Sequence, residues 1–111
     1  MPDERFKSCI DACNACAVAC NECAAACLEE DDVKMMAHCI ALDMDCVQAC
    51  SFAAAVMARG SEFAGSVCEM CAEICEACAE ECREHEADHC QRCADACERC
   101  AQECQSMASL A

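Results

Sequence analysis

Cysteine supplies most of the chemistry that this sequence can perform, because 19 of its 111 residues are cysteine. The stretch CIDACNACAVACNECAAAC, residues 9–27, places six of them at alternating steps of four and three residues. Such steps average 3.5 residues, so the six side chains form one stripe along an α-helix. Neighbouring thiols on the stripe have Cβ atoms about 5–6 Å apart, which lets two sulfurs bind one metal ion.

The same spacing returns in two later segments and, in a thinner form, in a third. The two full copies have cysteines at 68, 71, 75, 78 and 82 and at 90, 93, 97, 100 and 104. The thinner copy has them at 39, 46 and 50, and Asp43 fills the position that would complete its stripe. We predict that Asp43 also faces inward, as a metal ligand or as a hydrogen-bonding partner of thiols. The predicted metal ligands are all the cysteines: Cys9, Cys13, Cys16, Cys20, Cys23, Cys27, Cys39, Cys46, Cys50, Cys68, Cys71, Cys75, Cys78, Cys82, Cys90, Cys93, Cys97, Cys100 and Cys104.

Helices are the elements that must position these thiols. Proline occurs once and glycine twice, which is too few turn residues for a sheet protein, and the remaining composition favours helix. We predict helices at about residues 3–28, 32–59, 61–84 and 87–107. Four short helices close naturally as a bundle. The predicted fold is therefore all-α, an antiparallel up-down-up-down four-helix bundle with a cysteine-lined core, in a single domain over residues 1–111.

Capping residues indicate where the helices begin and end. Asp3 is the predicted N-cap of the first helix, and the acidic run at 29–32 gives a turn and a favourable negative start to the second. Gly60 is the predicted C′ residue after the second helix. The third helix is expected to start at Ser61 or at Ser66, where a capping box fits.

The break between the third and fourth helices has no glycine or proline to mark it. Its only sign is the step of eight residues from Cys82 to Cys90, where an unbroken stripe would give seven. A turn between the two helices is the simplest explanation. A single helix over residues 66–107 is the alternative, and it would require dimerisation.

Charge and composition exclude several classes of partner. A net charge of −15 and only three aromatic residues argue against nucleic acid, which needs cationic surfaces and stacking platforms. The sequence has no run of 18 or more apolar residues, so it does not suggest a membrane span. The N-terminal segment MPDERFKSCIDAC lacks the pattern of a secretory or twin-arginine signal. We therefore expect a cytoplasmic protein whose thiols stay reduced.

Four interpretations of the thiol stripes compete. Cysteine can fill a core as a small hydrophobe, but it packs poorly compared with leucine. Disulfides within one helix close loops of only a few residues and stabilise little. Zinc and iron–sulfur sites usually draw their ligands from loops. Soft thiolates select Cu(I), which accepts two or three sulfurs.

Charge neutrality favours Cu(I) further. One Cu(I) per thiolate leaves a buried core uncharged, whereas one zinc ion per thiolate would leave it positive. Such a core holds Cu(I) up to roughly the number of cysteines when sulfurs bridge ions. A capacity on that scale indicates storage or buffering, and we expect no enzymatic activity.

The chain resembles the bacterial copper storage proteins over nearly its whole length, because Cys-x3-Cys pairs recur down every predicted helix. The resemblance implies a four-helix bundle that binds many Cu(I) ions, assembly as a homotetramer, and membership of the cytosolic branch of the family, which lacks a twin-arginine signal. Asp43 departs from an all-cysteine row. The matching pairs are Cys9/Cys13, Cys16/Cys20, Cys23/Cys27, Cys46/Cys50, Cys71/Cys75, Cys78/Cys82, Cys93/Cys97 and Cys100/Cys104.

The two ends of the bundle differ in chemistry. One end is predicted to be a hydrophobic plug: its stripes meet Phe6, Met57, Ala64 and Met107, with Phe52 and Phe63 close by. The other end offers thioether, imidazole and carboxylate groups, so we predict that copper enters there, with His85 and Met36 on the stripes. The groups expected at this end are Glu30, Met35, Met36, His38, His85, Glu86 and His89.

Copper(I) storage is thus the function that the sequence predicts, with multiple copper ions per chain and a copper chaperone as a candidate partner. Two rival functions remain open. One is a general soft-metal buffer in the manner of a metallothionein, binding zinc or cadmium. The other is a helical scaffold stapled by disulfides.

Overall fold

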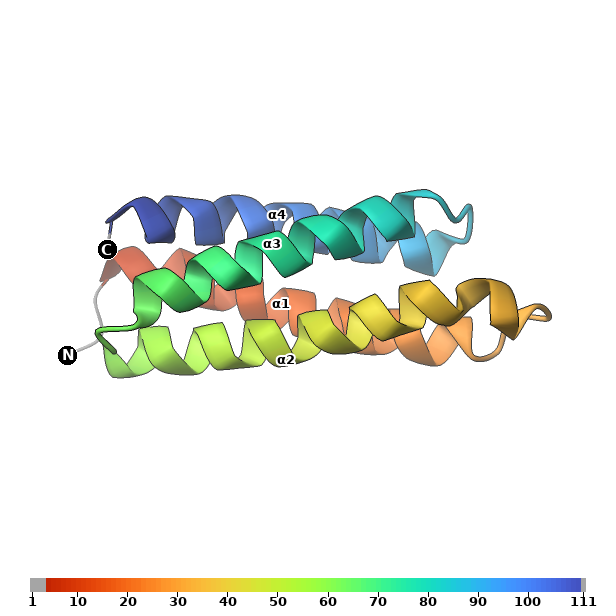
Figure 1. The fold of residues 1–111 in the computed structure, drawn as a ribbon, viewed down its shortest axis with the longest axis horizontal. Helices are drawn as coiled ribbons and strands as arrows, with labels where there is room; N and C mark the ends of the chain where they lie inside the picture. Colours follow the sequence, from red (N-terminus) through yellow and green to blue (C-terminus); the bar gives the residue numbers. More distant parts are fainter. Residues whose placement is uncertain (1–3, 111) are drawn as a thin grey trace.

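Four α-helices make up nearly all of the computed structural model, which describes residues 4–110 (Figure 1). Within those residues there is no β-strand. The predicted N-cap, Asp3, lies outside them. The helices are α1 (Glu4–Cys27), α2 (Ala37–Arg59), α3 (Ala64–Arg83) and α4 (Asp88–Leu110), and a short 3₁₀ helix, η1 (Val33–Met36), precedes α2.

The helices run alternately up and down and close into an elongated bundle of 47 × 18 × 18 Å (Figure 1). Each helix packs against its two neighbours around the bundle: α1 against α2 and α4, and α3 against the same two. The predicted up-down-up-down bundle is confirmed. The chain turns between α3 and α4, so the alternative of one helix over 66–107 is wrong.

The connection from α1 to α2 differs from the prediction, which started the second helix at residue 32. The Asp32 side chain accepts a hydrogen bond from the Met35 backbone N–H at 3.3 Å. This bond caps η1, and the α-helix itself begins only at Ala37. The acidic run therefore starts a 3₁₀ turn, which tightens the chain before α2.

Gly60 ends α2 as predicted. It adopts φ 67° and ψ 38°, a left-handed conformation that glycine reaches without steric cost. Its N–H bonds the Met57 carbonyl at 3.1 Å, and the Ser61 N–H bonds the Val56 carbonyl at 2.9 Å. This pair of bonds is a Schellman motif.

The predicted starts of α3 at Ser61 or Ser66 are wrong, because the helix begins at Ala64 after Phe63. Ser61 instead accepts a hydrogen bond from the Phe63 N–H at 3.0 Å and stabilises the preceding turn. Ser66 lies inside the first helical turn and caps nothing. The Schellman motif reverses the chain so tightly that the next helix starts within four residues.

Side chains hold the turn between α3 and α4 in place of glycine or proline. Gln91 of α4 donates from Nε2 to the carbonyl of His85 at 2.8 Å. Its Oε1 accepts a hydrogen bond from Arg83 Nη1 at 2.9 Å. These bonds satisfy polar groups that the break in the helix exposes. The fourth helix then continues to Leu110, three residues beyond the predicted end.

Alanine and cysteine fill the space between the helices. Small alanines such as Ala12, Ala53 and Ala94 are almost fully buried, which lets the helices approach closely. The other members of the core are mainly thiols, and Asp43 is the only buried polar or charged side chain among the described residues. The core is therefore one column of sulfur along the bundle axis.

Among the described residues, only the segment 33–59 is long and apolar enough to cross a membrane. In the bundle, however, Cys39 and Cys46 on its inner face contact thiols of other helices, and 44% of its most apolar window is buried. The segment thus packs one face into the core of the bundle.

Candidate metal centre

The metal-binding candidates of the core are its thiols. All 19 cysteines are fully buried and free, with no disulfide among them. The predicted inward orientation of the four stripes is therefore confirmed. Their role as metal ligands stays a prediction.

Thiols within one helix already lie at chelating distances. The sulfurs of Cys16 and Cys20 are 3.9 Å apart, and those of Cys23 and Cys27 are 3.8 Å apart. With a metal–sulfur distance of about 2.3 Å, as for zinc, sulfurs around a trigonal or tetrahedral ion are about 3.8–4.0 Å apart. The Cys-x3-Cys pairs thus need little movement to bind an ion.

Thiols also converge across the helix interfaces. Cys46 of α2 lies 3.5 Å from Cys75 of α3, and Cys9 of α1 lies 3.6 Å from Cys104 of α4. Cys39 and Cys82 are also 3.6 Å apart. An ion in the core can therefore take ligands from two or three helices.

In each of the five sulfur clusters named below, four sulfurs lie within 4.8 Å of one another. The three central clusters share Cys16, Cys20, Cys46 and Cys97, so one sulfur can bridge two ions. The two outer clusters continue the column through close sulfur pairs, Cys50 with Cys100 and Cys39 with Cys82, each 3.6 Å apart. Five of the clusters are Cys13/Cys71/Cys100/Cys104, Cys16/Cys46/Cys50/Cys75, Cys16/Cys20/Cys46/Cys97, Cys20/Cys78/Cys93/Cys97 and Cys23/Cys27/Cys39/Cys90.

Asp43 lies inside the core, as predicted, and hydrogen-bonds thiols. Its Oδ1 accepts from Cys78 at 3.2 Å and from Cys93 at 3.3 Å, while Oδ2 has no partner. Burial, together with the neighbouring Cys93, raises the pKa of Asp43 to about 10. A protonated carboxyl is therefore the stable form at neutral pH, which avoids an isolated buried charge.

Burial also keeps thiols protonated near the acidic end of the bundle. It raises the pKa of Cys90 to about 11 and raises that of Cys27 further, with the charge of Cys39 adding to both effects. Hydrogen bonds from Cys23 and Cys82 lower the pKa of Cys39 to about 3, so protonated thiols and one thiolate lie side by side at this end. A cation that binds there displaces protons.

His89 makes the closest approach of any imidazole to the thiols. Its Nδ1 is 3.5 Å from Cys90 Sγ, 3.7 Å from Cys23 Sγ and 3.9 Å from Cys27 Sγ. Its Nε2 donates to a carboxylate oxygen of Glu30 at 2.9 Å. Because a carboxylate only accepts, the neutral ring carries its proton on Nε2 and presents the Nδ1 lone pair to the thiols.

The sequence analysis predicted only that His89 lies near this end, and it assigned copper entry mainly to His85 and Met36. A side chain in the first turn of α4 leans back toward the helix start, so the residue beside the stripe covers the open end of the core. Its position directly before Cys90 is the signal that could have identified it. Spacing alone does not distinguish it from its neighbours.

The other predicted residues at this end lie around His89 at different depths. Met36 is buried, while Met35, His38 and Glu86 are exposed. The side chain of His85 is only 14% exposed and bonds a carboxylate, not a thiol: its Nε2 is 2.8 Å from Glu81 Oε2. No hydrogen bond links His85 or His38 to a described thiol.

The opposite end is closed by apolar side chains, in part as predicted. Met57, Ala64 and Met107 are buried, and Phe6 packs against the core beside them. Phe52 and Phe63, predicted only to lie close by, are 48% and 62% exposed. They lie on the outer surface and take no part in closing the core.

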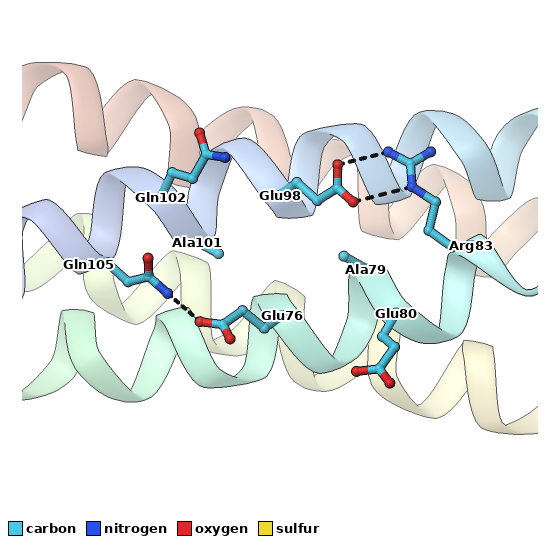
Figure 2. A pocket seen from close by; sticks show the side chains of 8 residues that line it. All are labelled: Glu76, Ala79, Glu80, Arg83, Glu98, Ala101, Gln102 and Gln105. Carbon is cyan, nitrogen blue, oxygen red and sulfur yellow. Dashed lines mark hydrogen bonds and ion pairs between the residues drawn. The ribbon is translucent and has the colours of Figure 1, made fainter.

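A hollow on the outer surface between α3 and α4 contains no thiol (Figure 2). Arg83 crosses it and bonds Glu98 at 2.8 Å and Asp95 at 2.5 Å. Gln105 and Glu76 form a second contact across the two helices. Arg83, the cation that lines the hollow, is therefore paired within the protein, and the thiols all lie in the core.

Comparison with known proteins agrees with this chemistry. A family model described as "Copper storage protein" matches residues 2–109. Curated protein sequences yield no match.

Solved structures of similar proteins share both fold and sequence. A Bacillus subtilis copper storage protein, Csp3, is 46% identical to this chain. Its Cu(I)-bound form has a TM-score of 0.91, and the match covers 95% of this chain and 99% of Csp3. Its apo form has a TM-score of 0.87, and the match covers 93% of this chain and 98% of Csp3. A cytosolic copper storage protein from Streptomyces lividans, with five coppers, is 40% identical, with a TM-score of 0.92 and 96% and 93% covered.

Proposed function

Since the chain belongs to the copper storage protein family, we propose that it stores many Cu(I) ions in the thiol core of its bundle, in the cytosol. The relative from Streptomyces lividans is described as cytosolic. A reducing compartment also suits 19 free thiols. Storage requires no turnover, and we assign the protein no catalytic role.

The observation that carries this function is the continuity of the thiol core. Overlapping clusters with shared sulfurs fit ions that accept bridging thiolates in two- or three-coordinate sites. Cu(I) accepts bridging thiolates in such sites, and one Cu(I) ion paired with one thiolate carries no net charge. Zinc held by four thiolates would leave two negative charges per site in the same apolar interior. All 19 cysteines are the proposed ligands, and Asp43 is an accessory group between them.

Copper is proposed to enter at the end where His89 closes the core. Its Nδ1 lone pair faces Cys23, Cys27 and Cys90, so it can take a Cu(I) ion from outside and pass it to sulfur. Glu30 holds the ring in that orientation from the solvent side. The buried thioether of Met36 offers a further soft donor for Cu(I) at the same end. The exposed thioether of Met35 offers another one closer to solvent.

An anaerobic titration of the reduced protein tests the stored ion. Free thiols are counted first, and Cu(I) and Zn(II) are then added separately in competition with a chelator of known affinity. We expect about 19 reactive thiols after unfolding and many tightly bound Cu(I) ions per chain. Tight zinc saturating near one ion per four sulfurs, without a larger copper capacity, would support a general metal buffer instead. A low thiol count would support a disulfide scaffold.

Assembly as a homo-oligomer, a tetramer by resemblance, is proposed through the outer face of α2 and α3. Phe52 and Met70 are 48% and 42% exposed and line a groove with Ala49 and Ile74. Apolar patches of this kind mark association surfaces. Sedimentation should show an oligomer for the wild type and smaller species for Met70→Glu, with Val18→Glu on α1 as the control. A monomeric wild type would contradict the proposal.

A copper chaperone is the proposed donor at the His89 end. The exposed carboxylates of the two loops there give the end a negative field, which attracts a partner with a basic surface. Transfer from such a donor should slow as ionic strength rises. Stopped-flow transfer at two salt concentrations measures this, and a salt-independent rate would argue against electrostatic docking.

A further inference from the structure

Two histidines and one glutamate converge beside the open end without touching the thiols. His38 lies in the first turn of α2, Glu81 in the last turn of α3, and His85 two residues beyond α3. His38 Nδ1 is 2.9 Å from Glu81 Oε1, and His85 Nε2 is 2.8 Å from Glu81 Oε2. Each carboxylate oxygen therefore has its own imidazole partner, and the two imidazoles come from different segments of the chain.

These distances are close to those of ligands around one ion. Nitrogen and oxygen donors at about 2.0–2.1 Å from a tetrahedral metal lie about 3.3 Å apart. A cation between either ring and its own carboxylate oxygen thus requires those two atoms to separate by only about 0.5 Å; to hold both rings, the ion needs the His38 ring to move toward His85. Glu81 and His85 have side chains 16% and 14% exposed, which holds them in position, whereas His38 is 71% exposed and can adjust.

The charges around the three residues favour a cation. Among the described residues, Glu81 pairs with no lysine or arginine, only with the two imidazoles. Arg83, two residues later, is held by Asp95 and Glu98 on another side of the bundle. Carboxylates concentrate cations in the surrounding solvent. Six exposed ones lie at this end, five in the two loops and one at the start of α4: Glu29, Asp31, Asp32, Glu84, Glu86 and Asp88.

We propose that His38, Glu81 and His85 form a second metal site that binds one borderline divalent cation, of which Zn²⁺ is the type, outside the thiol core. Imidazole and carboxylate donors suit zinc and similar divalent ions, while thiolates select Cu(I). A ring that binds the cation through the nitrogen facing Glu81 carries its proton on the other ring nitrogen. The open end then carries two kinds of site, a nitrogen and oxygen site outside and a sulfur site within.

Cobalt titration of the copper-loaded protein isolates this site. Cu(I) first fills the thiols, which removes them as ligands, and Co²⁺ is then added anaerobically as the spectroscopic stand-in for Zn²⁺. We expect one Co²⁺ per chain with the weak d–d absorption of nitrogen and oxygen ligands and no sulfur-to-cobalt charge transfer. Zn²⁺ should displace it. No saturable Co²⁺ binding, or binding with sulfur charge transfer alone, overturns the inference.

Variants assign the ligands. Glu81→Gln and His38→Ala should each weaken Co²⁺ binding at least tenfold, and His38 is so exposed that its replacement does not threaten the fold. Glu84→Gln is the matched control, because it removes one exposed charge at the same end and should change the affinity less than twofold. Equal weakening by all three would mean that only the local charge matters, and it would overturn the site.

Copper capacity is measured on every variant before cobalt is added. A normal Cu(I) load together with lost Co²⁺ binding locates the defect in the outer site. If the wild type took up no Cu(I), the proposed storage function would be wrong, but the outer site could still be tested. Co²⁺ bound in the core would show a sulfur charge-transfer band, and Co²⁺ bound by His38, Glu81 and His85 would not.

Discussion

Asp43 shows how one residue sets the electrostatic state of the empty core. It replaces a thiol in the α2 stripe, and it is the only buried carboxyl among the described residues. Its Oδ1 accepts bonds from Cys78 and Cys93 while Oδ2 is unpaired. A charged carboxylate in this position would lack the donors that it needs. The carboxyl therefore stays protonated, and ionising it would destabilise the empty bundle.

Asp43→Asn should therefore stabilise the apo protein in a pH-dependent way. Burial raises the pKa of Asp43 from 3.8 to about 10. Between these values the unfolded chain releases a proton that the folded protein retains, so the wild type loses stability as pH rises. Asparagine has no such proton. The difference in melting temperature should be near zero at pH 4, should grow toward pH 10, and is measured by thermal denaturation across that range.

A pH-independent difference would mean that Asp43 is already ionised in the folded protein. Cys78→Ala is a useful companion variant, because it removes one thiol donor to Oδ1 without changing the number of buried carboxyls. Its destabilisation should not grow with pH in the same manner.

His89→Ala should slow copper uptake without changing capacity. The ring is the group that faces both Glu30 and the outermost thiols, so its loss removes the proposed first nitrogen donor. We expect uptake to slow roughly tenfold, the lower range for losing a supporting group at a metal site. Stopped-flow absorbance in the thiolate–copper band measures the rate, and chelator competition measures capacity. The double variant His85→Ala/Met36→Ala tests the sequence-based alternative, and a larger effect there would contradict the role of His89.

At the scale of the elements, the heptad spacing explains why the helices and their inner faces could be predicted. A step of three or four residues leaves little choice of face, so Asp43 and Cys46 had to point inward once α2 was a helix. The cysteine spacing does not determine the residue at which each helix begins. The start of α3 at Ala64 depends on the reversal at Gly60, and the cap at Asp32 starts η1 before α2. Loop geometry likewise decides that His89 contacts thiols while His85 contacts Glu81.

Gly60 provides the stability test at this scale. Its left-handed backbone costs a residue with a Cβ about 1–2 kcal/mol, and nothing lies within 4 Å of the added Cβ. Gly60→Ala should therefore lower the free energy of unfolding by about that amount, through backbone strain alone. Gly60→Asn should cost less, because asparagine tolerates this conformation. Equal losses in urea denaturation would show that steric contact, not backbone conformation, limits the position.

For the whole molecule, the core lacks the large side chains that stabilise most bundles. Cysteine and alanine occupy the positions where leucine and isoleucine usually pack, with Met57 the largest fully buried side chain. Bound ions that join sulfurs of different helices supply cross-links that the apo core lacks. A ligand that binds only the folded state raises the free energy of unfolding by about 2.7 kcal/mol per site when its free concentration is a hundred times Kd.

Copper loading should accordingly raise the melting temperature by more than about 10 °C, since each kcal/mol shifts a domain of this size by about 4–8 °C. Calorimetry at increasing copper load should show the melting temperature rising with each addition until the thiols are filled. Zinc added at the same ratio should stabilise less, because it leaves buried negative charge. Unchanged melting after full loading would mean that the ions bind outside the core.

Proton release gives the sharpest test of a neutral core, because it counts charge directly. Raised pKa values keep the Cys90 and Cys27 thiols protonated before copper binds, so a Cu(I) ion that binds either of them must displace a proton. Where each ion displaces one proton, the net charge of the protein does not change as copper is stored, and a buried core can fill without accumulating repulsion. An indicator dye in weakly buffered, anaerobic solution should report about one proton per Cu(I) at neutral pH, and electrophoretic mobility should not change with load. Zinc bound by four thiols should release about four protons per ion and make the protein more negative. Far less than one proton per Cu(I) would mean that thiolates already exist in the empty core, and the charge argument for copper would then fail.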